Sequence, residues 1–252
     1  MEFAKPQKFI ARVSDKYFVS DNEKFLYLKF ELVLPDRIEY QAGQYVSLKV
    51  NNLGERRSYS IASTPDDNHG FHILAEIIPG GLGSEYLKGL KNGDTVELLG
   101  PLGRFVVNES LDQKTLKPLD NKLLFVATGS GIVPIYSMIN DLLVNKHETK
   151  QIRLHWGLRD ESHMFWFDNL ERLMEIYPNF VFDPVLSQPG EVWSLCSGHV
   201  QDCLTRDFSL IETGLKDWQG FVCGNPRMVE EVSSKLVALG MKETSVLHEK
   251  FV

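Results

Sequence analysis

LLFVATGSGIVP, residues 123–134, is the stretch that decides the fold of this chain. An apolar run typical of a strand buried on both faces leads into a glycine-containing turn. Pro134 then stands where the first turn of a helix should begin. Gly129 and Gly131 permit positive φ and a close backbone approach, and a helix N-terminus with free N–H groups suits a pyrophosphate. The spacing differs from G-x-G-x-x-G, so a tight strand-to-helix turn that needs glycine for its geometry alone is an equal alternative.

Downstream of this stretch, strand-like and helix-like patterns alternate to the end of the chain. Apolar runs predict strands at residues 123–127, 153–157, 180–186, 221–223 and 245–251. Apolar residues at helical spacing predict the intervening helices. Three of these helices are marked by apolar positions: Ile135, Met138, Ile139, Leu142 and Leu143; Phe167, Leu170, Met174 and Tyr177; and Val229, Val232, Leu236 and Leu239, with Gly240 at C′. A further short helix is predicted over residues 199–205. Such alternation predicts an α/β domain with a parallel sheet covered on both faces.

Upstream of it, the pattern is that of an all-β domain. Short β-branched or alternating runs between glycine-containing turns predict strands at residues 25–33, 45–50, 58–62, 71–78 and 95–99, with one short helix at residues 84–90. These runs predict an antiparallel β-barrel or β-sandwich, and of the two we expect the barrel. Residues 108–121, NESLDQKTLKPLDN, are polar and resemble a linker. The predicted organisation is therefore a β-barrel domain over residues 1–108, a linker over 109–121 and an α/β domain over 122–252.

Composition narrows the class of protein. The 252 residues carry a formal net charge of −7, which disfavours a general nucleic-acid binder. The N-terminal MEFAKPQKFI has no long apolar run, and no stretch approaches the roughly 20 apolar residues of a membrane helix. The three cysteines lack CxxC spacing and are too few for an iron–sulfur cluster. We therefore expect a soluble cytoplasmic protein that binds no metal and does not insert into a membrane.

Two segments of the barrel half carry candidate binding residues. In Arg56-Arg57-Ser58-Tyr59-Ser60, strand alternation puts Arg57 and Tyr59 on one face, where an arginine can pair with a phosphate and a tyrosine can stack on a ring system. Taken alone, an exposed arginine beside a half-buried tyrosine is the favoured interpretation. Residues 79–87, PGGLGSEYL, run a glycine-rich loop into a helix, with Ser84 as the expected N-cap. This loop is a second candidate phosphate cradle, or simply a turn and a cap.

The motifs RSYS, GGLGSEYL, GPLGRF, ATGSGIVP, CGNPRMV and a C-terminal EKF occur in that order along nearly the whole chain. Together they resemble the ferredoxin–NADP reductase family, with the bacterial ferredoxin- or flavodoxin-linked branch nearest. The resemblance implies an FAD-binding barrel and a nicotinamide-binding α/β domain. It implies FAD contacts from Arg57, Ser58, Tyr59, Ser60, Ala75, Glu76, Ile77, Gly83 and Ser84. It implies nicotinamide dinucleotide contacts from Thr128, Gly129, Ser130, Gly131, Ser187, Gly224, Pro226 and Met228.

The resemblance also assigns roles at the reacting end. Ser60 would lie near the flavin N5 and Cys223 beside the nicotinamide C4, while Glu249 and Phe251 match the family's C-terminal tail, which closes over the flavin. Phe251 is thus a candidate ring-stacking residue. The family tail often ends in a tryptophan that stacks on the adenine, whereas this chain ends in Val252. Either adenine packing is weaker here, or FAD adopts a different conformation.

Two positions in the sequence bear on whether the protein prefers NADH or NADPH. NADPH-using relatives carry two arginines that pair with the 2′-phosphate, and here Gln188 and His199 stand at those positions. Losing two cations beside a doubly charged phosphate costs several kcal/mol, at ~1.5–3 kcal/mol per charged hydrogen bond. Arg159 could compensate. These residues favour NADH.

The expected reaction is hydride transfer from the nicotinamide to the flavin, followed by single-electron transfer to a ferredoxin or flavodoxin. Such partners are acidic, so a local basic patch is expected, with Arg56, Lys49 and Lys250 as contributors. Two alternatives stay open, a reductase of free flavin and a non-catalytic flavin-binding subunit of a larger redox complex. Retention of FAD in gel filtration separates the first of these from a flavoprotein.

Overall fold

The computed structural model describes residues 3–20, 22–107, 122–209 and 214–251. The chain forms two compact units. One comprises the described residues up to 107 together with 136–146, and the other comprises 122–135 and the described residues from 147 onward. The predicted linker, residues 109–121, and the terminal Val252 lie outside the described residues. None of the helices in the described ranges combines the length and apolar character that a membrane crossing requires.

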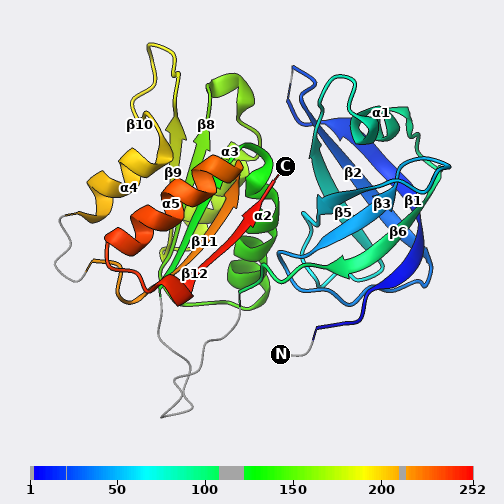
Figure 1. The fold of residues 1–252 in the computed structure, drawn as a ribbon, viewed down its shortest axis with the longest axis horizontal. Helices are drawn as coiled ribbons and strands as arrows, with labels where there is room; N and C mark the ends of the chain where they lie inside the picture. Colours follow the sequence, from blue (N-terminus) through cyan, green and yellow to red (C-terminus); the bar gives the residue numbers. More distant parts are fainter. Residues whose placement is uncertain (1–2, 21, 108–121, 210–213, 252) are drawn as a thin grey trace, which may run out of the picture. The chain divides into compact units, whose positions relative to one another are not determined.

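The first unit is built on a six-stranded antiparallel sheet (Figure 1). Its strands follow the order β4-β3-β6-β1-β2-β5, and a bridge between Ile61 and Ile73 links the segment after β4 to β5, the other edge strand. The sheet is therefore nearly closed, as the predicted barrel requires. The elements are β1 (Gln7–Phe18), β2 (Phe25–Leu34), β3 (Tyr45–Lys49), β4 (Arg56–Ser60), β5 (Gly70–Glu76), α1 (Leu82–Gly89) and β6 (Thr95–Leu102).

The alternation of buried and exposed side chains along the strands forms the core of the barrel. In β1, Phe9, Ala11 and Val13 are buried while the residues between them are exposed. Leu87 and Leu90, in and just after α1, are buried in the same core, so this helix packs onto the barrel. Residues 136–146 belong to this unit through contacts such as the Ser137 hydroxyl, which donates to the Ser63 carbonyl at 2.6 Å.

The second unit is built on a six-stranded parallel sheet, in the order β10-β9-β8-β7-β11-β12. Its elements begin with β7 (Lys122–Thr128), the 3₁₀ turn η1 (Gly129–Gly131) and the start of α2 (Ile132–Asn140). From residue 136 onward, α2 and the π-helical η2 (Asp141–Asn145) belong to the first unit. They continue with β8 (Ile152–Leu158), η3 (Glu161–His163), α3 (Phe167–Ile176), β9 (Phe180–Leu186), β10 (Cys196–Ser197), α4 (Val200–Phe208), β11 (Trp218–Gly224), α5 (Pro226–Ala238), η4 (Glu243–Ser245) and β12 (Val246–Lys250).

The parallel sheet is buried as the apolar runs predict. In β7, all five residues from Leu123 to Ala127 are buried. Helices α4 and α5 cover one face, where Leu204 and Val232 pack with the strand residues Val126 and Val222. Figure 1 shows these two helices side by side in front of the sheet, with α3 behind it. The predicted two-domain fold, an antiparallel barrel followed by a parallel α/β sheet, is confirmed.

Several local predictions were wrong for identifiable reasons. No strand is predicted over residues 7–18, because the charged outward residues of β1 dilute its apolar alternation. Ser84 is not an N-cap: Gly81 precedes the helix, and the Ser84 hydroxyl accepts the Ile78 N–H at 2.9 Å. Met174 does not face inward but is 38% exposed, and Leu173 is buried on α3 instead.

Candidate functional site

The glycine turn after β7 has the geometry that its sequence predicts. Gly129 has a φ of +53°, in the left-handed region that favours glycine. At Gly131 a Cβ would clash with the Cys223 carbonyl group and would lie 2.8 Å from the Gly224 Cα. Only a glycine therefore lets the start of α2 approach the backbone of β11 so closely.

Trp156 holds this turn in place. Its indole N–H donates to the Gly129 carbonyl at 3.0 Å, from a side chain that is fully buried in β8. Sequence reasoning missed this residue. The sequence offers only the general expectation that a buried tryptophan donates its indole N–H to some acceptor, and it does not say which one.

Strands β7 and β11 are neighbours at the point where the strand order reverses, which is where open α/β sheets bind ligands. Gly224, at the end of β11, has a φ of +144°, and a Cβ there would clash with the Thr128 hydroxyl. The Thr128 Oγ1 is buried and has no hydrogen-bond partner among the described residues. A buried unpaired hydroxyl is costly, so this atom and the glycine turn fit a ligand with acceptor oxygens, such as a dinucleotide phosphate.

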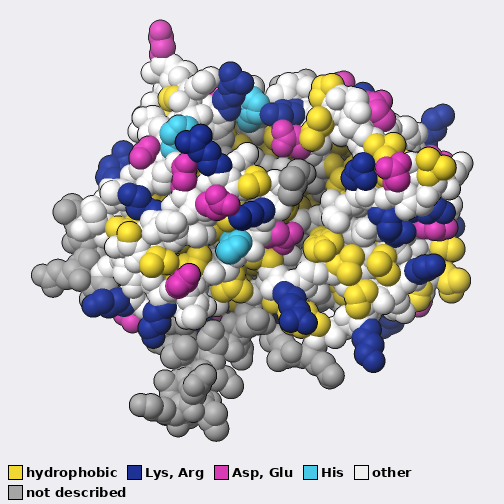
Figure 2. Space-filling model, in the orientation of Figure 1, with side chains coloured by type: hydrophobic (Ala, Val, Ile, Leu, Met, Phe, Trp, Pro, Cys, Tyr) yellow, Lys and Arg dark blue, Asp and Glu magenta, His cyan; other side chains and the backbone are white. Residues whose placement is uncertain are grey.

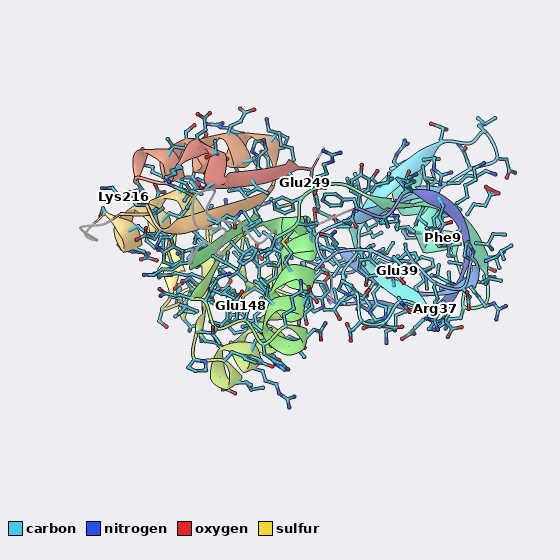
Figure 3. All side chains as sticks on the ribbon, turned by 90° about the horizontal axis from the view of Figure 1, so that it is seen from below. Phe9, Arg37, Glu39, Glu148, Lys216 and Glu249 are labelled. Carbon is cyan, nitrogen blue, oxygen red and sulfur yellow. A yellow bond between two sulfur atoms is a disulfide. The ribbon has the colours of Figure 1, made fainter. Side chains whose placement is uncertain are left out.

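Cys223 and Glu249 are register neighbours on β11 and β12. Cys223 is fully buried, and burial, with a smaller contribution from the Glu249 charge, raises the pKa of its thiol well above the ordinary value. Burial also raises the pKa of Glu249 to about 7. The Cys223 side chain is thus a neutral thiol, not a thiolate nucleophile. Figure 3 labels Glu249 on the C-terminal strand.

A backbone hydrogen bond and a helix N-cap fix the residues that follow the end of β11. The Phe251 N–H donates to the Gly224 carbonyl at 2.9 Å, which fixes the start of the tail beside β11. The Asn225 side chain caps α5, and Pro226 occupies its first turn. Met228 is buried on α5, with its methyl group close to Gly224. Ser130 lies within η1.

The loop after β9 carries the residues predicted to select the nicotinamide cofactor. The Gln188 N–H donates to the Arg159 carbonyl at 2.7 Å, and the Arg159 Nε donates back to the Gln188 side-chain oxygen at 3.0 Å. Ser187 is exposed next to this pair, and His199 is an exposed residue at the N-cap of α4. Arg159 thus engages Gln188 rather than standing alone.

In the first unit, α1 meets β4 at the predicted FAD residues. A Cβ on Gly83 would clash with the Tyr59 hydroxyl and would lie 3.0 Å from the Arg57 Cγ. Burial raises the pKa of Tyr59 to about 12, so the phenol is neutral. Arg57 is exposed and donates to the Arg56 carbonyl at 2.8 Å. A cation, a neutral aromatic and a helix start converge, which fits a phosphate joined to a ring system.

The other predicted FAD residues lie on the edge strands β4 and β5 or directly after β5. Ser58 is exposed and Ser60 is buried, on opposite sides of Tyr59 in β4. Ala75 is buried in the barrel core, so its side chain is directed away from solvent. Glu76 forms an ion pair with Lys24 at 3.2 Å, and the next residue, Ile77, donates its N–H to the Lys24 carbonyl.

The cations expected to form a basic patch are engaged elsewhere. Arg56 donates to the Ser47 carbonyl at 2.5 Å, Lys49 pairs with Glu97 at 3.2 Å, and Lys250 pairs with Glu230 at 2.8 Å. On the face shown in Figure 2, basic and acidic side chains are interspersed. Lys49 and Lys250 are thus paired with carboxylates, whereas Arg56 bonds a neutral carbonyl and keeps its charge, and the basic patch stays a prediction.

A buried polar cluster lies under α4. The Arg153 guanidinium donates to Asp183 at 2.6 Å and to Asp207 at 2.7 Å. His155 is fully buried, has no hydrogen-bond partner among the described residues, and has its Nε2 3.6–3.7 Å from both carboxylates. Burial lowers the pKa of His155 to about 4, so the ring is neutral. Because Arg153 already supplies the positive charge, we assign the cluster to structure and not to a metal.

A separate cavity of about 210 Å³ opens in the first unit. Its walls include Tyr40, Pro65, Met138 and the ion pair of Asp141 with Lys146. None of the predicted cofactor residues lines it.

Comparison with known proteins matches both halves of the chain. Residues 10–107 match the model of an oxidoreductase FAD-binding domain, and residues 125–234 match that of an oxidoreductase NAD-binding domain. The reductase component of a phenol 2-monooxygenase from Pseudomonas sp. (strain CF600) is 31% identical over 236 residues, which are 92% of this chain and 62% of that protein.

Solved structures agree. A cytochrome P450 reductase from Amycolatopsis superposes with a TM-score of 0.85 at 26% identity, covering 98% of this chain and 70% of that one. A ferredoxin–NADP⁺ reductase from Neisseria gonorrhoeae, solved with bound FAD and NADP, shares the fold with a TM-score of 0.78 at 21% identity, covering 98% of this chain and 99% of that one. The chain spans less than two thirds of the length of the phenol monooxygenase component that it matches.

Proposed function

Because the chain belongs to the ferredoxin–NADP reductase family, we propose that it is an FAD-dependent oxidoreductase. It takes electrons from NADH or NADPH and passes them to a separate one-electron carrier protein of the ferredoxin or flavodoxin class. The observation that supports this proposal is the unpaired hydroxyl of Thr128, the residue that precedes the glycine turn. A dinucleotide phosphate bound at this turn would offer it an acceptor.

Bound FAD supplies the chemistry, because a flavin accepts two electrons from a nicotinamide and releases them singly. The protein residues bind and orient. Arg57 pairs with the FAD pyrophosphate at the start of α1, and Tyr59 offers its ring face for stacking. Gly129 and Gly131 let the dinucleotide phosphates approach the N-terminus of α2.

Cys223 and Glu249 act at the nicotinamide end. The neutral, buried Cys223 is a positioning residue whose thiol packs against the nicotinamide, so Cys223→Ala slows flavin reduction without releasing FAD. Unchanged flavin reduction in a stopped-flow experiment contradicts this role. The Glu249 carboxyl is poised to hold or release a proton near neutral pH, since its pKa is about 7.

We propose NADH as the preferred electron donor. Gln188 is held by Arg159, and its neutral amide suits the ribose hydroxyls of NADH better than the 2′-phosphate of NADPH. The test is kcat/KM for the two donors with ferricyanide as acceptor. A strong preference for NADPH contradicts the assignment.

The carrier protein is proposed from relatives that are named as reductase components. The acceptor test supplies purified ferredoxin and flavodoxin to the reduced holoprotein and follows their reduction. Saturable reduction of either supports the proposal. A protein that loses all flavin in gel filtration, yet reduces added FAD, is instead a free-flavin reductase.

A further inference from the structure

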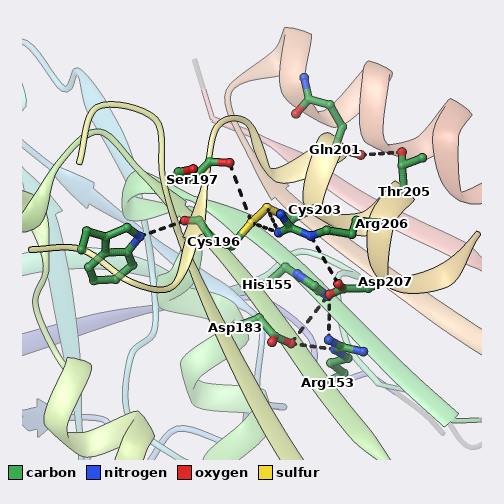
Figure 4. Close-up of a disulfide and its surroundings, with 11 residues drawn as sticks. Arg153, His155, Asp183, Cys196, Ser197, Gln201, Cys203, Thr205, Arg206 and Asp207 are labelled. Carbon is green, nitrogen blue, oxygen red and sulfur yellow. Dashed lines mark hydrogen bonds and ion pairs between the residues drawn. A yellow bond between two sulfur atoms is a disulfide. The ribbon is translucent and has the colours of Figure 1, made fainter. Parts of the chain in front are cut away.

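Cys196 and Cys203 form a disulfide that the sequence spacing did not predict (Figure 4). It ties β10, a strand of two residues, to the first turn of α4. The two sulfurs differ in access. Cys196 is partly exposed, whereas Cys203 is only 1% exposed and belongs to the core beneath α4 and α5.

A cation lies against both sulfurs. The Arg206 Nη2 is 2.6 Å from the Cys196 Sγ and 3.3 Å from the Cys203 Sγ. Arg206 follows Cys203 by one helical turn, and its Nε lies 4.0 Å from Asp207, which is itself held by Arg153. The Arg206 guanidinium favours a thiolate at either sulfur, whereas the burial of Cys203 disfavours one there.

The remaining cysteine has the opposite environment. Cys223 is fully buried, and both burial and the nearby Glu249 charge raise its thiol pKa. It is therefore inert toward disulfides at neutral pH and serves as an internal reference.

We propose that Cys196 and Cys203 form a reversible thiol–disulfide exchange site that reacts with a small-molecule thiol couple such as glutathione. In the reducing direction, an external thiolate attacks the accessible Cys196 Sγ, and the S–S bond breaks. The bonding electrons leave with Cys203 as a thiolate beside Arg206. A second external thiolate then attacks the external sulfur of the mixed disulfide, which forms the external disulfide and releases Cys196 as the leaving thiolate. Two external thiols become one external disulfide, and their two electrons and two protons pass to the two cysteines.

The site is placed to control the loop after β9. Residues 187–199 connect β9 through β10 to α4, and Ser187 and Gln188 at their start are the predicted contacts of the nicotinamide cofactor. Besides the disulfide, hydrogen bonds hold this loop: the Gly198 N–H donates to the Leu186 carbonyl at 2.8 Å, and the Gly190 N–H donates to the Glu161 carboxylate at 2.8 Å. Reduction removes the covalent tie and leaves these bonds in place, and we expect the affinity for NADH to fall about fivefold. This consequence rests on the proposed function, whereas the exchange chemistry does not.

The exchange is tested on the holoprotein, equilibrated in buffers that run from reduced to oxidised glutathione, then alkylated and analysed by peptide mass spectrometry. Cys196 and Cys203 should change together between alkylated thiols and a disulfide, while Cys223 stays a thiol throughout. Two results overturn the proposal: both cysteines alkylated in excess oxidised glutathione, or both still bonded in excess reduced glutathione.

The role of Arg206 has its own control. Arg206→Met should slow reduction by glutathione about three- to tenfold, because the leaving thiolate loses its cation. Arg227→Met removes an exposed arginine that pairs with Glu231 on α5, and should leave the rate unchanged. Equal rates in the wild type and in Arg206→Met, with matching circular dichroism, refute the assignment of Arg206.

Coupling to the loop is measured as the Kd for NADH of the oxidised and reduced holoprotein. The Cys196→Ser/Cys203→Ser variant should give the reduced value in both buffers. Equal Kd values in both states refute the coupling. If neither state binds NADH or NADPH, the proposed function fails, while the mass-spectrometric result still decides the exchange site.

Discussion

Gly131→Ala tests the nucleotide turn at its tightest point. The new Cβ would lie 2.6 Å from the Cys223 carbonyl carbon and 2.8 Å from the Gly224 Cα, where real Cβ contacts stay beyond 3.0 Å. These atoms are backbone of a central strand and cannot rotate away. The start of α2 must therefore shift by about half an ångström, an overpacking that costs about 1–3 kcal/mol of stability.

The functional effect follows from the same displacement. Moving the N-terminal amides of α2 away from the cofactor phosphates should lower kcat/KM for NADH about ten- to hundredfold, since misplacement of this order is costly. FAD content should not change, because Arg57, Tyr59 and Gly83 lie in the other unit. The assay is NADH–ferricyanide reduction, with FAD quantified from the visible spectrum. Gly89→Ala is the matched control, because its Cβ meets no heavy atom within 4 Å. A folded Gly131→Ala protein with unchanged kcat/KM refutes the reasoning.

Other substitutions address the remaining residues. Arg57→Ala should release FAD during gel filtration, whereas Arg56→Ala, whose side chain is bonded to Ser47, should retain it; equal retention argues against a pyrophosphate role for Arg57. Gln188→Arg should raise kcat/KM for NADPH relative to NADH about tenfold, at ~1.5–3 kcal/mol per charged hydrogen bond, and an unchanged ratio contradicts the specificity assignment. Glu249 has a raised pKa, so its contribution to stability is full below its unfolded pKa near 4.5 and is lost as pH rises through about 7. The wild-type Tm should therefore fall between about pH 5 and pH 8 relative to Glu249→Gln, and parallel curves exclude this ionisation.

Much of the fold was predictable because burial leaves a simple trace in sequence. Strand β9 is predicted with its observed bounds, and the five apolar residues of β7 are all buried. The barrel strand β1 escaped because its outward residues are charged, so only half of the pattern carries apolar signal. The offset on α3 arises because Leu173 and Met174 are adjacent, and apolar character alone does not say which of them faces inward.

The site was predictable only where glycine geometry or a family motif marks it. The close approach of Gly131 to β11 follows from a motif, but the partner strand lies about ninety residues away in sequence and is specified by topology. The Trp156 bond to Gly129 and the Cys196–Cys203 disulfide depend on side chains brought together by packing. Neither has a spacing that sequence rules recognise.

The central claim is that the chain holds FAD and reduces it with a nicotinamide cofactor. The most direct measurement is the visible spectrum of the purified protein during anaerobic titration with NADH and, separately, with NADPH. The purified protein should show a flavin band that survives gel filtration and bleaches with one equivalent of NADH per flavin. A colourless protein that takes up no FAD on reconstitution, or a bound flavin that neither donor bleaches, contradicts it.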